Sequence, residues 1–301
     1  MSSWIEKDNR KPLKNLCIIL FINYYLKKKM TNKKFSFVIP CFNAGEFINK
    51  NINKLIKFLK NNNYNYEIIL IDDGSSDNTF IKLKELQSKF KKIKILKNKK
   101  NYGKSFSIKQ GLKKTKFINV VLIDCDLPYF NALNKIIKGL LEGNDFVLIN
   151  RRNKYSKIVN KLDLYKVLRK IVGYILGKIF YLFLKLDISG SDTQAGLKAF
   201  KKIRNFDKHK FISNKFFLDV ELINLYSVYN KKIKSIPVKF SYSKISSINI
   251  FDLKNFVIMF EAIKIIVYLK FLKLWTNFVK NLVIHFYFLD FKIRKQMTNW
   301  N

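Results

Sequence analysis

Cysteine and histidine are scarce in this 301-residue chain, which has 3 cysteines and 2 histidines. Cys17, Cys41 and Cys125 lie far apart, and no two of them form a CxxC pair, so neither a zinc site nor a disulfide framework is indicated. His209 and His285 are too widely separated in sequence to indicate a metal site. Any chemistry is therefore expected to use carboxylates, lysines and arginines.

Acidic residues are also few, with 21 Asp and Glu against 59 Lys and Arg, which gives a net charge of +38. Such a charge has three explanations: binding to nucleic acid, binding to an anionic membrane, or a plain compositional bias. The basic residues are mostly Lys, and they accompany many Asn, Ile and Phe, as an AT-rich coding sequence would produce. They are dispersed, and no zinc finger, helix-turn-helix or RNP motif is present, so no nucleic-acid partner is expected.

Long apolar runs are missing. The longest run without charge, residues 15–26, is shorter than the roughly 20 residues that a membrane-spanning helix needs. Met30 precedes an ordinary first strand, so residues 1–32 are expected to be either a weak N-terminal anchor or a dispensable extension.

The chain from residue 33 onward alternates between apolar runs and amphipathic segments. Strands without polar alternation, separated by helices, predict a mainly parallel sheet covered on both faces. Ligands of such sheets bind beyond the carboxyl ends of the strands. The predicted strands are 35–40, 67–73, 92–96, 117–124 and 145–150, and the predicted helices are 46–60, 77–90, 104–114 and 131–141.

Acidic residues follow two of these strands. Asp72 and Asp73, before Gly74 and Ser75, fit a turn and a helix cap. Asp124 and Asp126 differ, because two carboxylates leaving a buried strand repel each other unless a cation or hydrogen-bond donors compensate. Oxygen ligands of this kind suit Mg²⁺ or Mn²⁺.

The stretch "NYGKSF" contains a Gly-Lys-Ser like the end of a P-loop. A P-loop needs a further glycine at the position of Asn98, where its backbone helps to wrap a phosphate. An ATP site is therefore not favoured.

Several motifs in order resemble the inverting family 2 glycosyltransferases, which implies the A-type nucleotide-diphospho-sugar transferase fold with amphipathic membrane-associated helices. They are "SFVIPCFNAGEFI", "EIILIDDGSSDNT", "NYGKSFSIKQGL", "VLIDCD" and "SDTQAGLKAF". The stretch "DTQAGLKAF", followed by "FFLDVELINL", is similar to the polyprenyl- and dolichyl-phosphate glucosyltransferases. The resemblance implies a catalytic domain over 33–245 and a basic, apolar helical tail over 246–301.

The same resemblance implies a nucleotide-sugar donor, with UDP-glucose favoured, and Mg²⁺ or Mn²⁺ as cofactor. Asp124 and Asp126 would hold the metal, and Pro128 stands where relatives often have a polar residue. The donor-binding positions would be Pro40, Phe42, Asn43, Asp73, Asn101, Gly103, Lys104 and Asp124.

The acceptor implied by the resemblance is a polyprenyl or dolichyl phosphate. Such an anion can attack the anomeric carbon without a strong base, and its phosphate would be bound by Arg151, with Arg152 and Arg169 as further candidates. A sugar hydroxyl as acceptor would instead require a carboxylate base, for which Asp219 or Glu221 is available. The catalytic residues are thus expected to be Asp126, Arg151 and, for a hydroxyl acceptor, Asp219; a helix-surface or structural role is the alternative for Asp219 and Glu221.

Two segments have the pattern of interfacial helices. Over residues 161–186 the charged side chains fall on one half of a helical wheel, and residues 251–291 are similarly apolar with interspersed lysines. A core-facing amphipathic helix is the alternative for both. The interfacial interpretation predicts peripheral attachment to the cytoplasmic face of a membrane with anionic lipids.

Overall fold

The computed structural model describes residues 33–159, 192–240 and 260–271, together with positions 167, 171, 173–175, 177–180 and 182. The N-terminal segment 1–32, Arg169, most of the predicted helix over 161–186 and the tail on either side of 260–271 lie outside the described residues.

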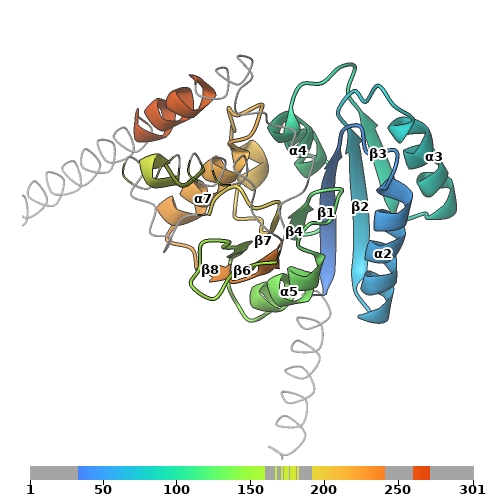
Figure 1. Cartoon of the computed structure of the whole chain (residues 1–301), viewed down its shortest axis with the longest axis horizontal. Coiled ribbons are helices and arrows are strands. Elements are labelled where there is room, and N and C mark those ends of the chain that lie inside the picture. Colours follow the sequence, from blue (N-terminus) through green and yellow to red (C-terminus); the bar gives the residue numbers. More distant parts are fainter. Residues whose placement is uncertain are drawn as a thin grey trace, which may run out of the picture.

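A seven-stranded sheet forms the centre of the described chain (Figure 1). Its strands are parallel except for β7, which runs antiparallel to both of its neighbours, β4 and β5. Buried apolar side chains on both faces explain why the strands lack polar alternation. In spatial order the strands are β3 (Ile93–Lys97), β2 (Asn65–Asp72), β1 (Lys34–Cys41), β4 (Asn119–Ile123), β7 (Leu197–Lys201), β5 (Phe146–Ile149) and β8 (Ile233–Ile236).

Helices cover both faces of this sheet, as the sequence predicts (Figure 1). Helices α2 (Ile48–Asn61), α3 (Thr79–Lys89) and α5 (Leu133–Leu141) pack on one face. Helices α4 (Lys104–Leu112) and α7 (Leu218–Val228) pack on the other. The single-turn helices η1 (Phe130–Ala132) and η2 (Phe206–Lys208), and a small sheet of β6 (Lys157–Ile158) and β9 (Lys239–Phe240), complete the described part.

Helical residues 260–271 pack beside α7 and have two distinct faces. Ala262, Ile265 and Leu269 are buried in the same core cluster as α4 and α7. The outer face exposes large apolar side chains: Phe260 70%, Ile263 56%, Val267 62% and Phe271 64%. None of the helices in the described residues is long and apolar enough to cross a membrane.

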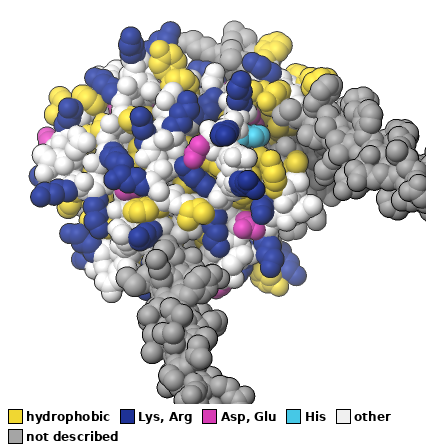
Figure 2. Space-filling view, turned by 180° about the vertical axis from the view of Figure 1, so that it is seen from behind, with side chains coloured by type: hydrophobic (Ala, Val, Ile, Leu, Met, Phe, Trp, Pro, Cys, Tyr) yellow, Lys and Arg dark blue, Asp and Glu magenta, His cyan; other side chains and the backbone are white. Residues whose placement is uncertain are grey.

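Lysines and arginines are scattered over the surface. Figure 2 shows them spread across the visible face, with few acidic side chains between them. They do not gather into one stripe on this face, which agrees with the dispersed pattern in the sequence.

Candidate active site

The acidic pair follows β4 at the carboxyl edge of the sheet. Asp124 accepts a hydrogen bond from Leu127 N at 3.0 Å through its backbone oxygen, and Leu127 has a positive φ of 50°, so the chain turns sharply here. Asp126 is exposed, and Asp124 is 27% exposed. Partial burial and the Asp124 charge raise the pKa of Asp126, an effect that Lys104 partly offsets. Two crowded carboxylates fit a divalent cation.

Gly196, just before β7, lets this turn pack closely. Asp124 N donates to Gly196 O at 3.0 Å, and a Cβ at position 196 would lie 1.9 Å from Asp124 Oδ2. Any side chain at position 196 would therefore displace the Asp124 carboxylate. The close approach explains the glycine in "DTQAGLKAF".

Lys104 brings a positive charge to the same carboxylate. Its Nζ lies 2.5 Å from Asp124 Oδ1. Burial lowers the pKa of Lys104, but the charges of Asp124 and Asp219 outweigh burial and raise it. A divalent cation that binds Asp124 has to share this carboxylate with the ammonium or displace it.

Asp73 holds the loop that leads to Lys104. It is 3% exposed and accepts hydrogen bonds from Tyr102 N at 3.1 Å, Gly103 N at 2.9 Å and Asn98 Nδ2 at 2.8 Å. Gly103 has a φ of +111°, a conformation that favours glycine. These loop amides are directed at a protein carboxylate, unlike the phosphate-binding amides of a P-loop.

The predicted nucleoside-side residues lie beside the turn that follows β2. Phe42 is 45% exposed. Asn43, with φ +47°, donates its N–H to Ser75 Oγ at 3.0 Å, and its Oδ1 accepts from Ser76 N at 3.0 Å. These contacts fix the end of β1 against the 72–76 turn. Pro40 is half-buried at the end of β1, and Asn101 is exposed in the loop before α4.

Arg151 follows β5 and forms a two-pronged ion pair with Asp192. Arg151 Nε lies 2.6 Å from Asp192 Oδ2, Nη2 lies 2.7 Å from Oδ1, and the backbone N–H of Arg151 also donates to Oδ2. Asp192 is 1% exposed, and the Arg151 guanidinium lowers the pKa of its carboxyl despite burial. Tyr129 OH lies 3.4 Å from Arg151 Nη1. The plane of the guanidinium is therefore fixed.

Arg152 takes another direction. Its Nη2 donates to Gly173 O, and its guanidinium lies 5.7 Å from the centre of the Tyr174 ring. The structure thus directs Arg151 to the Asp192 turn and Arg152 to the described residues of the 173–177 segment.

Lys198 and Asp219 form a buried ion pair that sequence reasoning missed in part. Lys198 Nζ lies 2.7 Å from Asp219 Oδ2 and donates to Ala195 O at 2.6 Å. Burial lowers the pKa of Lys198, although the Asp219 charge opposes this shift. A lysine at an inward position of an apolar strand, "GLKAF", was the available signal. Asp192, in the same motif, was likewise given no role.

Glu221 is a structural acceptor. It is 1% exposed and accepts hydrogen bonds from Ile212 N at 2.8 Å and Ser213 N at 2.9 Å. Asp219 is also buried, so the helix-surface alternative is wrong for both residues. The alternative of a structural contact fits Glu221.

Few side chains at the site could hold a metal ion. In the part of the chain that the structure describes, no group of three or more His, Cys, Asp or Glu side chains converges as a metal cluster. Asp124 and Asp126 supply hard oxygen ligands, and the remaining positions around a cation would fall to a substrate phosphate and water.

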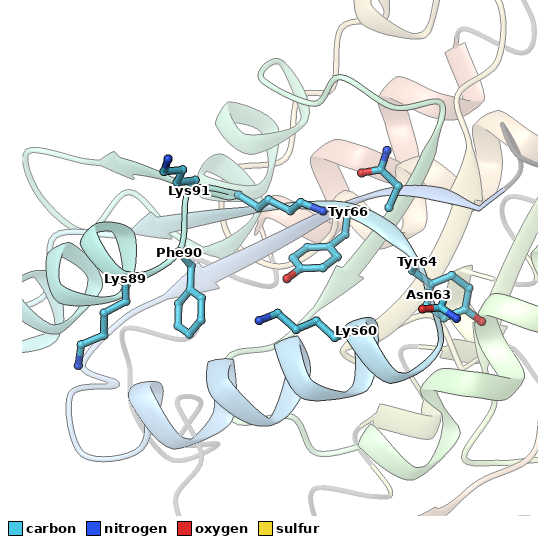
Figure 3. A pocket seen from close by; sticks show the side chains of 9 residues that line it. Lys60, Asn63, Tyr64, Tyr66, Lys89, Phe90 and Lys91 are labelled. Carbon is cyan, nitrogen blue, oxygen red and sulfur yellow. The ribbon is translucent and has the colours of Figure 1, made fainter.

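A pocket of about 530 Å³ lies at the opposite end of the sheet, around the start of β2 (Figure 3). Two of its lysines lie over aromatic rings: Lys60 Nζ lies 5.9 Å from the centre of the Phe90 ring, and Lys92 Nζ lies 4.6 Å from that of Tyr66. Carboxylates and histidines are absent from its lining residues, so this pocket offers no carboxylate or imidazole ligand for a metal ion.

The three-layer fold, with its acidic edge after β4, is that of the A-type nucleotide-sugar transferases. The chain belongs to glycosyl transferase family 2, whose sequence profile matches residues 36–203. This confirms the fold and the family that the motifs indicated.

The relatives differ in how much of the chain they match. Dolichyl-phosphate beta-glucosyltransferase ALG5D of Trichomonas vaginalis is 26% identical, and the matched region covers 80% of this chain and 75% of the relative. The dolichyl-phosphate beta-glucosyltransferase of Dictyostelium discoideum is 28% identical, covering 71% of this chain and 68% of its own. CsbB of Bacillus subtilis is 34% identical, but this chain spans only 43% of its length.

Solved structures share the fold at low identity. Mannosyl-3-phosphoglycerate synthase of Rubrobacter xylanophilus has a TM-score of 0.53 at 16% identity, covering 79% of this chain and 76% of its own. Glucosyl-3-phosphoglycerate synthase of Mycobacterium tuberculosis, solved with Mn²⁺, UDP and glucosyl-3-phosphoglycerate, has a TM-score of 0.52 at 16% identity. The matched region covers 73% of this chain and 75% of the synthase chain.

Proposed function

We propose that the protein transfers a hexose, with glucose from UDP-glucose favoured, to a polyprenyl or dolichyl phosphate with inversion, in a reaction that depends on Mg²⁺ or Mn²⁺. One observation carries this proposal. The Asp124–Asp126 pair and the Arg151–Asp192 pair lie at one edge of the sheet, just beyond the ends of the neighbouring strands β4, β7 and β5. Carboxylates that could hold a cation therefore lie at the same edge as an arginine whose guanidinium is held in place by Asp192.

The donor side would be built from the ends of β1, β2 and β4. Phe42 and Asn43 would line the nucleoside, and Asp73 would support it through the loop that it holds. A cation bound by Asp124 and Asp126 would stabilise the negative charge on the departing nucleotide diphosphate. Lys104 adds a second positive charge beside Asp124 for the same purpose.

The acceptor side would depend on Arg151. Asp192 fixes the guanidinium before an acceptor arrives, so little reorganisation is needed when the lipid phosphate binds. A phosphate oxygen is already anionic and attacks the anomeric carbon without giving up a proton.

A sugar hydroxyl is the second candidate acceptor, and it needs a base. Asp219 is engaged by Lys198 at 2.7 Å, and Glu221 accepts two backbone hydrogen bonds. Both carboxylates are thus committed to other groups. This favours the phosphate acceptor, for which Asp219 would serve to hold Lys198 and its strand in place.

The deciding experiment supplies purified protein with vesicles containing polyprenyl phosphate, Mg²⁺ and one labelled nucleotide-sugar at a time. We expect label from UDP-glucose to enter the organic phase as an acid-labile lipid phosphate sugar. Label that appears only in water-soluble glycans when sugar acceptors are offered would favour the hydroxyl acceptor. The absence of any transfer from all nucleotide-sugars would contradict the proposal.

The exposed face of residues 260–271 would rest on the membrane. Phe260, Ile263, Val267 and Phe271 form an apolar surface, and the neighbouring Lys264 is exposed. Apolar side chains flanked by lysines suit the boundary of an anionic bilayer. Attachment at the cytoplasmic face would bring the sheet edge to a lipid phosphate.

Ile263→Glu should weaken binding to anionic vesicles by about tenfold or more, because burial of one such side chain contributes roughly 1.5–3 kcal/mol. Flotation of the full-length protein with phosphatidylglycerol vesicles measures the effect, and high salt should release part of the wild-type protein. Ile81→Glu is the matched control, since Ile81 is 63% exposed on α3, which covers the other face of the sheet. Equal losses for the two variants would refute the assignment of this surface.

A further inference from the structure

The loop over residues 212–216 is held by two carboxylates from different helices. Glu221 of α7 accepts the backbone N–H groups of residues 212 and 213 at 2.8 and 2.9 Å. Glu261 accepts those of residues 214–216 at 2.7, 2.8 and 3.2 Å. Successive loop N–H groups thus donate to carboxylates, while the carbonyl groups of residues 214 and 215 accept hydrogen bonds from α4.

Those carbonyl groups meet the start of α4. Ser105 N donates to Lys215 O at 2.9 Å, and Phe106 N donates to Asn214 O at 2.9 Å. A Cβ on Gly103 would lie 2.6 Å from Asn214 O, so the loop lies too close to the residue before the helix to leave room for a side chain there. The first turn of α4 therefore takes its position from this loop.

Lys104 lies at this junction. Asp73 holds Gly103 N from one side, and the 212–216 loop holds Ser105 N from the other. Between these supports, Lys104 Nζ reaches Asp124 at 2.5 Å. A shift of the loop would move Lys104 away from Asp124, the carboxylate that the proposed function places beside the nucleotide diphosphate.

We propose that Glu261 is a positioning residue for the nucleotide-sugar site, acting through the 212–216 loop on Lys104. The role rests on the proposed function. Glu261 lies outside residues 36–203 that match the family profile, on the helix whose outer face carries Phe260 and Ile263. The helix that would face the membrane thus also supports the donor side.

Glu261→Gln tests this role in the full-length chain. An amide offers one acceptor oxygen and places an NH₂ group against backbone N–H groups that now donate to a carboxylate. We expect the Kd for UDP, measured by calorimetry with Mn²⁺ present, to rise about tenfold. The KM for the nucleotide-sugar should rise with it, while the KM for the lipid phosphate stays unchanged.

Two variants complete the test. Glu261→Asp keeps the charge and should restore part of the UDP affinity. Glu85→Gln removes an exposed carboxylate on α3 with one long contact, Asn49 Nδ2 at 3.4 Å, and should bind UDP like the wild type. A folded Glu261→Gln protein with wild-type UDP affinity would overturn the role of Glu261 alone. A wild-type chain that binds no UDP would overturn the proposed donor and this role together.

Discussion

Asp126→Asn should reduce turnover by about 10²-fold or more, because it removes one charge that would hold the cation against the nucleotide diphosphate. Partial burial of its carboxyl and the charge of the nearby Asp124 raise the pKa of Asp126, so loss of its charge relieves an unfavourable interaction in the folded protein. The melting temperature should therefore change little. Turnover measured over a range of Mn²⁺ concentrations, beside thermal unfolding, checks both parts of this expectation.

Asp207→Asn is the matched control for this change. Asp207 pairs with Lys202 at 2.7 Å, and its side chain is 65% exposed. A surface pair of this kind contributes about 0–1 kcal/mol, so turnover and its dependence on metal should stay at wild-type levels. Extra Mn²⁺ should restore part of the activity of Asp126→Asn. Near-normal transfer by Asp126→Asn without added metal would rule out this metal site.

The alternation of strands and helices could be predicted because its signals are local. Apolar runs such as "EIILIDD" and the helical spacing of Ile48, Ile52 and Leu55 each lie within one element. The acidic edge followed from the same reasoning, since parallel strands end at one side of the sheet. Asp124 and Asp73 could therefore be assigned to that edge from the sequence alone.

Two ion pairs of the site, Arg151–Asp192 and Lys198–Asp219, depend on a strand that was not predicted. β7 lies between β4 and β5 and runs against both, although it follows β5 in the sequence. This insertion brings Asp192 into an ion pair with Arg151 and Lys198 into an ion pair with Asp219. Neither pairing leaves a local pattern, because each joins residues from distant parts of the chain. Glu261 was missed for the same reason.

Arg151→Ala has consequences for both stability and acceptor use. Asp192 is 1% exposed, and removal of its partner leaves a buried charge, which typically costs about 3–5 kcal/mol. We expect the melting temperature to fall by at least about 6 °C. The KM for the lipid phosphate should rise far more than the Kd for UDP, because the proposed function assigns Arg151 to the acceptor phosphate. Calorimetry with UDP and assays over a range of acceptor concentrations separate the two constants.

A double variant separates the two roles of Arg151. Arg151→Met combined with Asp192→Asn removes both charges, so the buried carboxylate no longer lacks a partner and most of the lost stability should return. Acceptor use should stay impaired in this protein, since no guanidinium remains to bind a phosphate. Arg151→Lys should show an intermediate acceptor defect. An ammonium keeps the positive charge for the acceptor phosphate, but it lacks the planar guanidinium that Asp192 holds in place. If the double variant regains acceptor use with its stability, Arg151 acts only through the fold, and the acceptor phosphate is bound elsewhere.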